Sequence, residues 1–417
     1  MKHLIFICSL LLISPLLKSC SDSDSIVVED EDVTNIDLDL KSEKLIEADN
    51  AFGLDLFKEV NTELDEGKNL MISPLSISLA LAMVYNGADG DTKSQMETML
   101  HKSGFSPDQI NKAYQSLVKA LADHDPQVKI SIANAIFYDQ NFNIKSDFIS
   151  TNQTYYDAEV DKLDFNNSLS TLDRVNGWVK NKTNNKIEKI IDQVSPTDAI
   201  FLMNAIYFKG QWTSQFEKDN TADRAFYTEN GNELQVPTMM LDETTLNYTG
   251  TSQFQLLELP YGGEKYSMLI LLPTEEYSTN DVIAEMNQSN LNNLLENLHE
   301  RNLKVYLPKF EFAYANSLVD NLKALGMNDA FIASLSDFSG ISDIPDLYIS
   351  EVKHKSYIKV DEEGTEATAV TGVTFEVTSA GPEPVFDVNR PFVFAIREKD
   401  TNAILFMGKV NNPLLDE

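Results

Sequence analysis

The sequence predicts an α+β fold, in which helices and large antiparallel or mixed sheets build one domain. Runs rich in β-branched and aromatic residues predict strands, and amphipathic runs between them predict helices, but the two kinds do not alternate regularly. Composition is uniform from about residue 46 onward, with no internal repeat and no Gly/Ser linker. The strand-like runs are residues 129–138, 199–208, 266–272, 303–310 and 392–410.

The chain begins with features of an export signal. In residues 1–19, Lys2 and His3 precede an apolar run that ends in a small residue before Cys20. The stretch LLKSC resembles a bacterial lipobox, in which Cys20 would be lipidated as the first residue of the mature chain. Simple signal cleavage, with Cys20 incidental, is the alternative. We expect an exported lipoprotein whose only membrane contact is the lipid anchor at Cys20.

The next segment, residues 20–45, is acidic, lacks aromatic side chains and has no helical period. We therefore expect a disordered tether that precedes a folded domain over residues 46–417. Acidic residues directly after a lipidated cysteine also resemble the surface-export signals of some Gram-negative lipoproteins. The expected location is the outer membrane, on the surface of a Gram-negative cell.

Charge and cysteine content exclude several function classes. The chain carries 33 basic and 65 acidic residues, a net charge of −32, which argues against nucleic acid and anionic lipid surfaces as partners. Its two cysteines are Cys8 and Cys20, so the mature domain has neither a disulfide nor thiol chemistry. Its stability must come from an apolar core, for which 42% hydrophobic residues suffice at this length.

Helix signals begin with a four-residue apolar period at Phe52, Leu56, Val60 and Leu64. The second helix should follow Ser73, whose hydroxyl can cap it, with Pro74 in its first turn. Asn86-Gly87 should end this helix. A further helix is predicted over residues 171–183, and a hairpin that turns at Lys399–Asn402 should join the last two strands.

The chain lacks motifs of known catalytic or metal centres. It has no His-Glu-x-x-His, Cys-x-x-Cys, Gly-x-Ser-x-Gly or P-loop motif. The histidines of the mature chain form no close pair: they are His101, His124, His299 and His354. Carboxylate pairs are uninformative, because 65 acidic residues produce any spacing by chance. A catalytic triad scattered along the chain is the one enzymatic interpretation left open. We expect no metal, no cofactor and no enzymatic activity.

One segment near the C-terminal end reads both as a loop and as a strand. Strict alternation over residues 365–377 is typical of a half-buried strand. Three acids and Gly364 precede it, and Gly381, Pro382 and Pro384 follow it, as in a surface loop. The alternate positions that are small or apolar are Thr365, Ala367, Ala369, Thr371, Val373, Phe375 and Val377.

Several stretches resemble the signature segments of the serpin family, in the family's order and spacing over residues 50–413. They are ISPLSISLALAMVYNGADGDT, MNAIYFKGQW, LPKF, VKHKSYIKVDEEGTEATAVTG, NRPFVFAI and FMGKVNNP. The resemblance implies an α+β fold of three β-sheets and about nine helices, with an exposed reactive-centre loop between two of the sheets. It also implies a suicide-substrate inhibitor of serine proteases, or sometimes of cysteine proteases.

This resemblance explains the ambiguous segment. In serpins the loop is an exposed bait, here from residue 364 to 384, and after cleavage its N-terminal part inserts as a central strand of sheet A. Small residues on the inward face and the absence of proline from residues 364–381 suit such insertion. The hinge that the resemblance implies is Glu362, Glu363, Gly364, Thr365, Glu366, Ala367, Thr368 and Ala369.

Two supporting groups carry over by position. The first would be the shutter, a polar cluster under the opening of sheet A: Ser73, Ser76, Asn204 and His354. The second would be the breach near the top of that sheet, with an ion pair between Lys309 and Glu362 and with Trp212 beside it. We expect this pair to be exposed and therefore worth about 0–1 kcal/mol.

The family's spacing after the hinge predicts cleavage between Thr378 and Ser379. Counting back from Pro391-Phe392 gives a point near Ala380, so Val377 and Ala380 are alternatives.

Specificity follows from the residue types around this bond. No Arg or Lys lies between Lys359 and Arg390, which disfavours trypsin-like targets because these require a cation in the S1 pocket. Elastase-like, subtilisin-like and papain-like proteases fit better. The expected partner is a target protease in a covalent complex with a monomeric inhibitor. A non-inhibitory serpin that acts as a surface binding or scaffold protein is the alternative.

Overall fold

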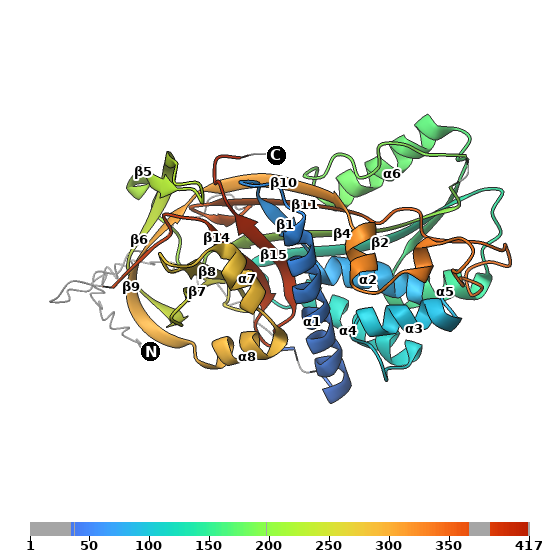
Figure 1. The fold of residues 1–417 in the computed structure, drawn as a ribbon, viewed down its shortest axis with the longest axis horizontal. Coiled ribbons are helices and arrows are strands. Elements are labelled where there is room, and N and C mark those ends of the chain that lie inside the picture. Colours follow the sequence, from blue (N-terminus) through green and yellow to red (C-terminus); the bar gives the residue numbers. More distant parts are fainter. Residues whose placement is uncertain (1–34, 37, 197, 367–383, 416–417) are drawn as a thin grey trace, which may run out of the picture. The chain divides into compact units, whose positions relative to one another are not determined.

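The computed structural model describes residues 35–36, 38–196, 198–366 and 384–415, which belong to one compact unit (Figure 1). The expected signal peptide and the lipidation site Cys20 lie outside the described residues. So do the end of the hinge and the whole of the expected cleavage region: Ala367, Thr368, Ala369, Val377, Thr378, Ser379 and Ala380.

Nine α-helices occur among the described residues, as the family resemblance implied. They are α1 (Leu40–Thr62), α2 (Pro74–Tyr85), α3 (Gly90–Met99), α4 (Pro107–Ala122), α5 (Ser146–Tyr156), α6 (Ser168–Lys182), α7 (Thr279–Glu285), α8 (Gln288–Glu296) and α9 (Val319–Ala324). In the described residues, no helix has the length and apolarity needed to cross a bilayer.

The smaller sheet has six strands in the order β10-β11-β12-β4-β2-β3. Its long central strands β2 and β4 pair antiparallel along nearly their whole length, whereas β2 and β3 are parallel. The strands are β2 (Val128–Asp139), β3 (Glu159–Leu163), β4 (Ile200–Gln211), β10 (Phe310–Ser317), β11 (Lys353–Asp361) and β12 (Gly364–Thr365).

The larger sheet has nine strands, with β1-β15-β14-β8-β7-β6-β9-β13 in order and β5 paired to β6. The pairing of β6 with β9 shifts register between Leu241 and Thr244, which divides this sheet into two parts that continue through both strands. With the six-stranded sheet they make the three sheets expected. The strands are β1 (Leu70–Ile72), β5 (Ala222–Tyr227), β6 (Glu233–Gly250), β7 (Phe254–Tyr261), β8 (Tyr266–Pro273), β9 (His299–Pro308), β13 (Val385–Asp387), β14 (Phe392–Glu398) and β15 (Ile404–Val410).

The main core lies between the sheets, and α2 contacts both β4 and β15 within it. Helix α2 is almost entirely buried because it is apolar all round, and Ser73 and Pro74 start it as predicted, with Ser73 Oγ accepting from the Ser76 N–H. A smaller core lies on the opposite face of β2 and β4 under α6, where Val175 and Trp178 pack (Figure 1).

The ordered domain begins earlier than the predicted boundary at residue 46. Helix α1 starts at Leu40, Leu45 is buried, and Ile36 and Leu38 pack against the core. The Ile36 N–H also donates to Asp400 Oδ2 at 2.9 Å. The acidic composition concealed these few apolar residues, which are enough to dock the last part of the expected tether.

The predicted run 303–310 is also two strands rather than one. Strand β9 ends at Pro308, which has no N–H to donate, and β10 begins at Phe310 in the other sheet. Lys309 lies at this crossing between sheets. The predicted hairpin is confirmed, since β14 and β15 pair antiparallel on either side of a turn at residues 399–402.

Candidate functional site at the opening of the six-stranded sheet

The first residues of the expected exposed loop lie inside the six-stranded sheet. Gly364 and Thr365 form β12, which pairs antiparallel with β11 on one side and with β4 on the other. Thr365 is only 3% exposed, so the prediction of an exposed loop from residue 364 is wrong for these two residues. Alternation of residue types predicted a strand but could not show how much of it is already paired.

Gly364 is required by the close approach of β4. Its φ of +148° lies outside the range that other residues adopt readily, and a Cβ atom there would lie 2.1 Å from the Gly210 carbonyl oxygen. Gly210 is itself opposite Thr365 in the register. At this first position of the register, β12 and β4 therefore approach each other through backbone atoms.

Within the described part of the chain, β12 is the only strand between β4 and β11, and no ladder joins these two strands directly. We call the line between β4 and β11 the seam, and a small cavity of about 20 Å³ follows β12 along it. Its walls include Ile206 and Phe208 from β4 and Tyr357 and Ile358 from β11. The seam is thus the place where the sheet has fewest backbone bonds between neighbours.

The two faces of β12 meet different surroundings. The Thr365 hydroxyl lies 2.7 Å from the Tyr261 hydroxyl, within the main core. Glu366 turns to the opposite face, with a φ of +57° and a carboxylate 3.3 Å from Lys186 Nζ. Burial raises the pKa of Glu366, although Tyr207 and Lys186 oppose the rise. The consecutive hinge residues Thr365 and Glu366 therefore face opposite sides of the sheet, as the alternation predicted.

The structure brings the expected breach residues together. Lys309 Nζ lies 2.8 Å and 3.0 Å from the two carboxylate oxygens of Glu362, and Thr221 donates to Glu362 Oε1 at 2.8 Å. The expectation of an exposed pair is wrong, because the Glu362 side chain is only 6% exposed and that of Lys309 is 36% exposed. Burial alone would raise the pKa of Glu362, but bonds from Lys309 and Thr221 hold it below its usual range.

Trp212 joins the breach to the hinge turn. Its ring N–H donates to the Asp361 carbonyl at 2.9 Å, and its backbone N–H donates to the Glu363 carbonyl at 3.0 Å. Lys218, a few residues later, forms an ion pair with Glu363. The segment after β4 thus wraps the turn before β12. Sequence reasoning missed Lys218, Thr221 and Tyr261, because no local pattern links them to a hinge more than 100 residues away.

The expected shutter residues also form one hydrogen-bonded group. Ser76 Oγ donates to Asn204 Oδ1, and the Ser73 N–H donates to His354 Nε2 at 3.2 Å. Asn204 in turn donates to Asn134 Oδ1 at 2.6 Å, a partner that the sequence did not predict. All of these side chains are uncharged, since burial lowers the pKa of His354 to about 4.

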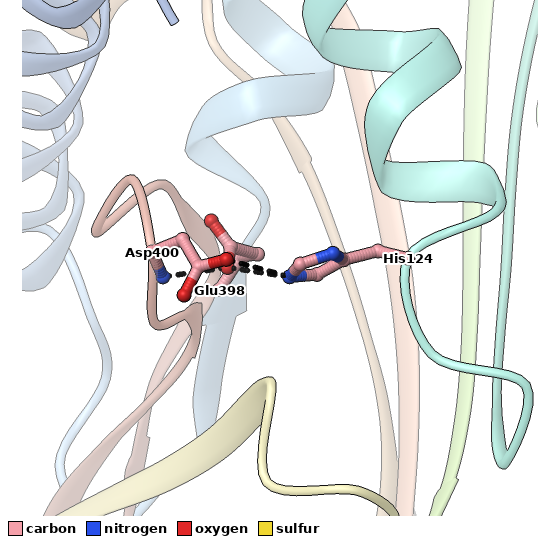
Figure 2. A group of neighbouring side chains, drawn as sticks. All are labelled: His124, Glu398 and Asp400. Carbon is pink, nitrogen blue, oxygen red and sulfur yellow. Dashed lines mark hydrogen bonds and ion pairs between the residues drawn. The ribbon is translucent and has the colours of Figure 1, made fainter. Parts of the chain in front are cut away.

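A second polar cluster lies at the hairpin between β14 and β15 (Figure 2). His124 Nε2 lies 3.0 Å from Glu398 Oε1 and 3.5 Å from Asp400 Oδ2, a donor set that could ligate a metal ion. However, Glu398 also accepts from the Thr401 N–H, and Asp400 pairs with Lys265.

The tautomer of His124 decides between these possibilities. Its Nδ1 is buried and has no hydrogen-bond partner, so a proton there would be unsatisfied. The proton therefore belongs on Nε2, where it is donated to Glu398. Metal ligation through Nε2 would move that proton to the unpartnered nitrogen. The geometry favours a hydrogen-bonded cluster that fixes the hairpin to the end of α4.

Comparison with known proteins identifies the class. The family model "Serpin (serine protease inhibitor)" matches residues 47–413. Serpin B6 of Macaca fascicularis is 37% identical over 377 residues, covering 88% of this chain and 99% of the relative. Intracellular coagulation inhibitor 2 of Tachypleus tridentatus is 35% identical, covering 89% of this chain and 92% of the relative. The chain therefore belongs to the serpin family.

Solved structures agree with this assignment. The thermophilic serpin tengpin in its native state has a TM-score of 0.81 and 37% identity, covering 91% of this chain and 96% of tengpin. The latent state of tengpin also matches, with a TM-score of 0.77 and 34% identity, covering 90% of this chain and 99% of tengpin. The predicted serpin-like α+β fold is confirmed. Members of this family are typically protease inhibitors rather than catalysts, although non-inhibitory serpins exist.

Proposed function

We propose that this chain is an inhibitory serpin, which traps a serine protease as an acyl-enzyme when its cleaved loop inserts between β4 and β11. The observation that carries the proposal is the position of β12. The first two residues of the loop are already paired with both strands that would flank the inserted one. Further insertion would therefore extend an existing strand and would need no new register.

Extending that register would bring the inserted loop to the shutter residues. Gly364 is opposite Gln211 and Asp361, so each later loop residue would be opposite an earlier residue of β4 and of β11. At Thr371 the same count reaches Asn204 and His354 together. The Thr371 hydroxyl would then enter the polar cluster that holds the two strands, and could replace bonds lost when they part.

The energy for trapping would come from the fold itself. Inserting roughly 13 residues as a central strand satisfies their backbone groups and buries one face, a gain on the order of 10 kcal/mol. The native state would be held short of this minimum by a kinetic barrier.

Cleavage would release this energy at the acyl stage. The target's serine oxygen would bond to the carbonyl carbon of Thr378, and the amide nitrogen of Ser379 would leave as a new amino terminus. Insertion would then be faster than hydrolysis of the acyl ester by water. Val377 and Ala380 remain alternative positions, and the small residues in this region favour elastase-like, subtilisin-like or papain-like targets.

We also propose that the inhibitor is a monomer that is anchored to the outer membrane and faces outward from the cell. The lipobox-like LLKSC and the acidic residues after Cys20 support this location. A Cys20→Ser variant should lose incorporation of a palmitate analogue and should leave the detergent phase. Unchanged detergent partition of this variant would contradict lipidation at Cys20.

Incubation with an elastase, a subtilisin and a papain-like protease tests inhibition. We expect a band on a denaturing gel at the summed mass of inhibitor and protease for at least one of them. An Ala367→Pro variant is the matched control, since proline on the inserting strand removes a ladder donor and should give clean cleavage. Clean cleavage of the wild-type chain by all of the proteases would contradict the proposal and favour a binding or scaffold protein.

A further inference from the structure

We infer that Tyr261 is a positioning residue for loop insertion, because its hydroxyl holds Thr365 at the first register position of the inserting strand. This inference rests on the proposed inhibitory function. It assigns a role to a side chain of β7, which belongs to the other sheet and is more than 100 residues from the hinge in sequence.

The contact is short, buried and exclusive among the described residues. The Tyr261 and Thr365 hydroxyl oxygens are 2.7 Å apart, and the two residues are 0% and 3% exposed. Neither hydroxyl has another hydrogen-bond partner in the described part of the chain. Burial raises the pKa of Tyr261 far above its ordinary value, so the phenol stays protonated. Loss of either hydroxyl would leave the other without this partner at a buried position.

The ring of Tyr261 is fixed independently of this bond. It stacks on Trp212 with centroids 4.4 Å apart and planes 13° apart, and it meets Phe208 edge-on at 5.1 Å. Gly210 leaves room for it, because a Cβ there would lie 3.0 Å from the ring. Trp212 also binds the Asp361 carbonyl just before β12. The hydroxyl is therefore presented at one position, and Thr365 is the residue that meets it.

This anchor matters because insertion competes with deacylation. If Thr365 is already held, the strand can extend from Glu366 without first finding its register. If Thr365 is loose, insertion begins later, and more acyl-enzyme is hydrolysed before it is trapped. The anchor should therefore lower the number of inhibitor molecules consumed for each protease molecule inhibited.

The test removes the hydroxyls and leaves the packing. Tyr261→Phe keeps the stacked ring, Thr365→Val keeps the shape, and Thr365→Ser keeps the hydroxyl as the matched control. We expect Tyr261→Phe and Thr365→Val each to raise the stoichiometry of inhibition severalfold. Thr365→Ser should remain near wild type. The double variant Tyr261→Phe/Thr365→Val should be no worse than the single ones, because both remove the same bond.

Hydrogen exchange gives a second readout that needs no protease. The Glu366 N–H donates to the Lys359 carbonyl at 3.3 Å, so its exchange reports whether the hinge stays in the sheet. Loss of the anchor should speed this exchange about tenfold. In a Trp178→Phe background, Trp212 is the only tryptophan, and its emission should change as the hinge detaches.

The outcomes separate the inference from the proposed function. Unchanged stoichiometry and unchanged exchange in Tyr261→Phe and Thr365→Val, with a covalent complex in the wild type, would overturn the role of Tyr261. Faster exchange in these variants without any covalent complex in the wild type would support the anchor and refute inhibition. If Tyr261→Phe fails to fold, Thr365→Val tests the same bond from the other side.

Discussion

Two regions of this serpin bury polar side chains, and they do so with different chemistry. In the nine-stranded sheet the buried groups include a charged pair, Glu258–Arg397, in which the Oε1–Nη2 distance is 2.6 Å and the side chains are 2% and 7% exposed. At the shutter, beneath the seam between β4 and β11, the polar groups are neutral and include the half-buried Asn204 and the buried His354. A charged pair is thus buried where strands stay paired, whereas the shutter uses neutral polar groups where strands would part.

The energies explain this division. Removing one partner of a buried ion pair leaves an uncompensated charge and costs about 3–5 kcal/mol. Breaking a neutral hydrogen bond costs about 0.5–1.5 kcal/mol, which a moving strand can recover with new partners. The breach differs from both, because Glu362 is buried but the Lys309 side chain is 36% exposed, so water screens this pair.

The largest expected effect is in the sheet that stays paired. Arg397→Met leaves Glu258 buried without its main cation and should lower the free energy of unfolding by about 3–5 kcal/mol. Urea denaturation measures this loss, and it should be similar for the intact and the loop-cleaved chain. Lys112→Met removes an exposed pair and is the control, with an expected change below about 0.5 kcal/mol. Equal effects of the two substitutions would contradict the comparison.

The shutter should make the seam sensitive to acid. His354 titrates near 6.5 when unfolded, and burial lowers its pKa in the fold to about 4, so the unfolded chain binds the extra proton first. Neutral His354 therefore leaves the free energy of unfolding undiminished above pH 6.5. As the pH drops to 4, protonation of the unfolded chain lowers this free energy by on the order of 3 kcal/mol. His354→Gln should reduce the slope of unfolding free energy against pH in this window. An unchanged slope would contradict a neutral shutter.

The neutral bonds of the shutter should have a smaller and more selective effect. Asn204→Ala removes the partner of Ser76 Oγ and of Asn134 Oδ1 and should cost about 1–3 kcal/mol in the intact chain. Because parting of β4 from β11 becomes easier, loss of inhibitory activity on mild heating should also be faster. Incubation at about 45 °C followed by a stoichiometry assay measures this rate. A variant as durable as the wild type would show that the shutter does not hold the seam.

The smallest effect is expected at the breach. Lys309→Met removes a partly exposed cation and should cost about 0.5–1.5 kcal/mol. The pKa of Glu362 is lowered in the fold, so the ionised carboxylate stabilises the folded state at any pH above its ordinary pKa. This stabilisation is lost as the pH falls through the folded pKa. The cost of Lys309→Met should therefore shrink in acid. A cost that is the same at pH 7 and pH 3 would contradict this account of the pair.

Local signals in the sequence predicted much of the fold. Alternation identified most of β2 and β4, and Ser73 with Pro74 marked the start of α2. The shutter and breach residues came only from the family resemblance. The sequence did not indicate β6, because its acidic register shift at residues 242–243 interrupts the alternation.

Contacts between distant segments could not be predicted. The paired state of Gly364 and Thr365 depends on β4 and β11, and the Tyr261 contact depends on another sheet. The docking of Ile36 likewise depends on the hairpin turn at Asp400. Each of these three contacts depends on which distant segments of the backbone are neighbours in the fold. Composition and periodicity do not specify those neighbours.

The central claim is that the intact chain is trapped above its lowest free energy. Cleaving the loop once within residues 377–381 and melting the purified product beside the intact chain tests it most directly. Because insertion would add on the order of 10 kcal/mol, the nicked chain should unfold roughly 10–20 °C higher. A nicked chain that unfolds at the same temperature as the intact one, or below it, would contradict the claim.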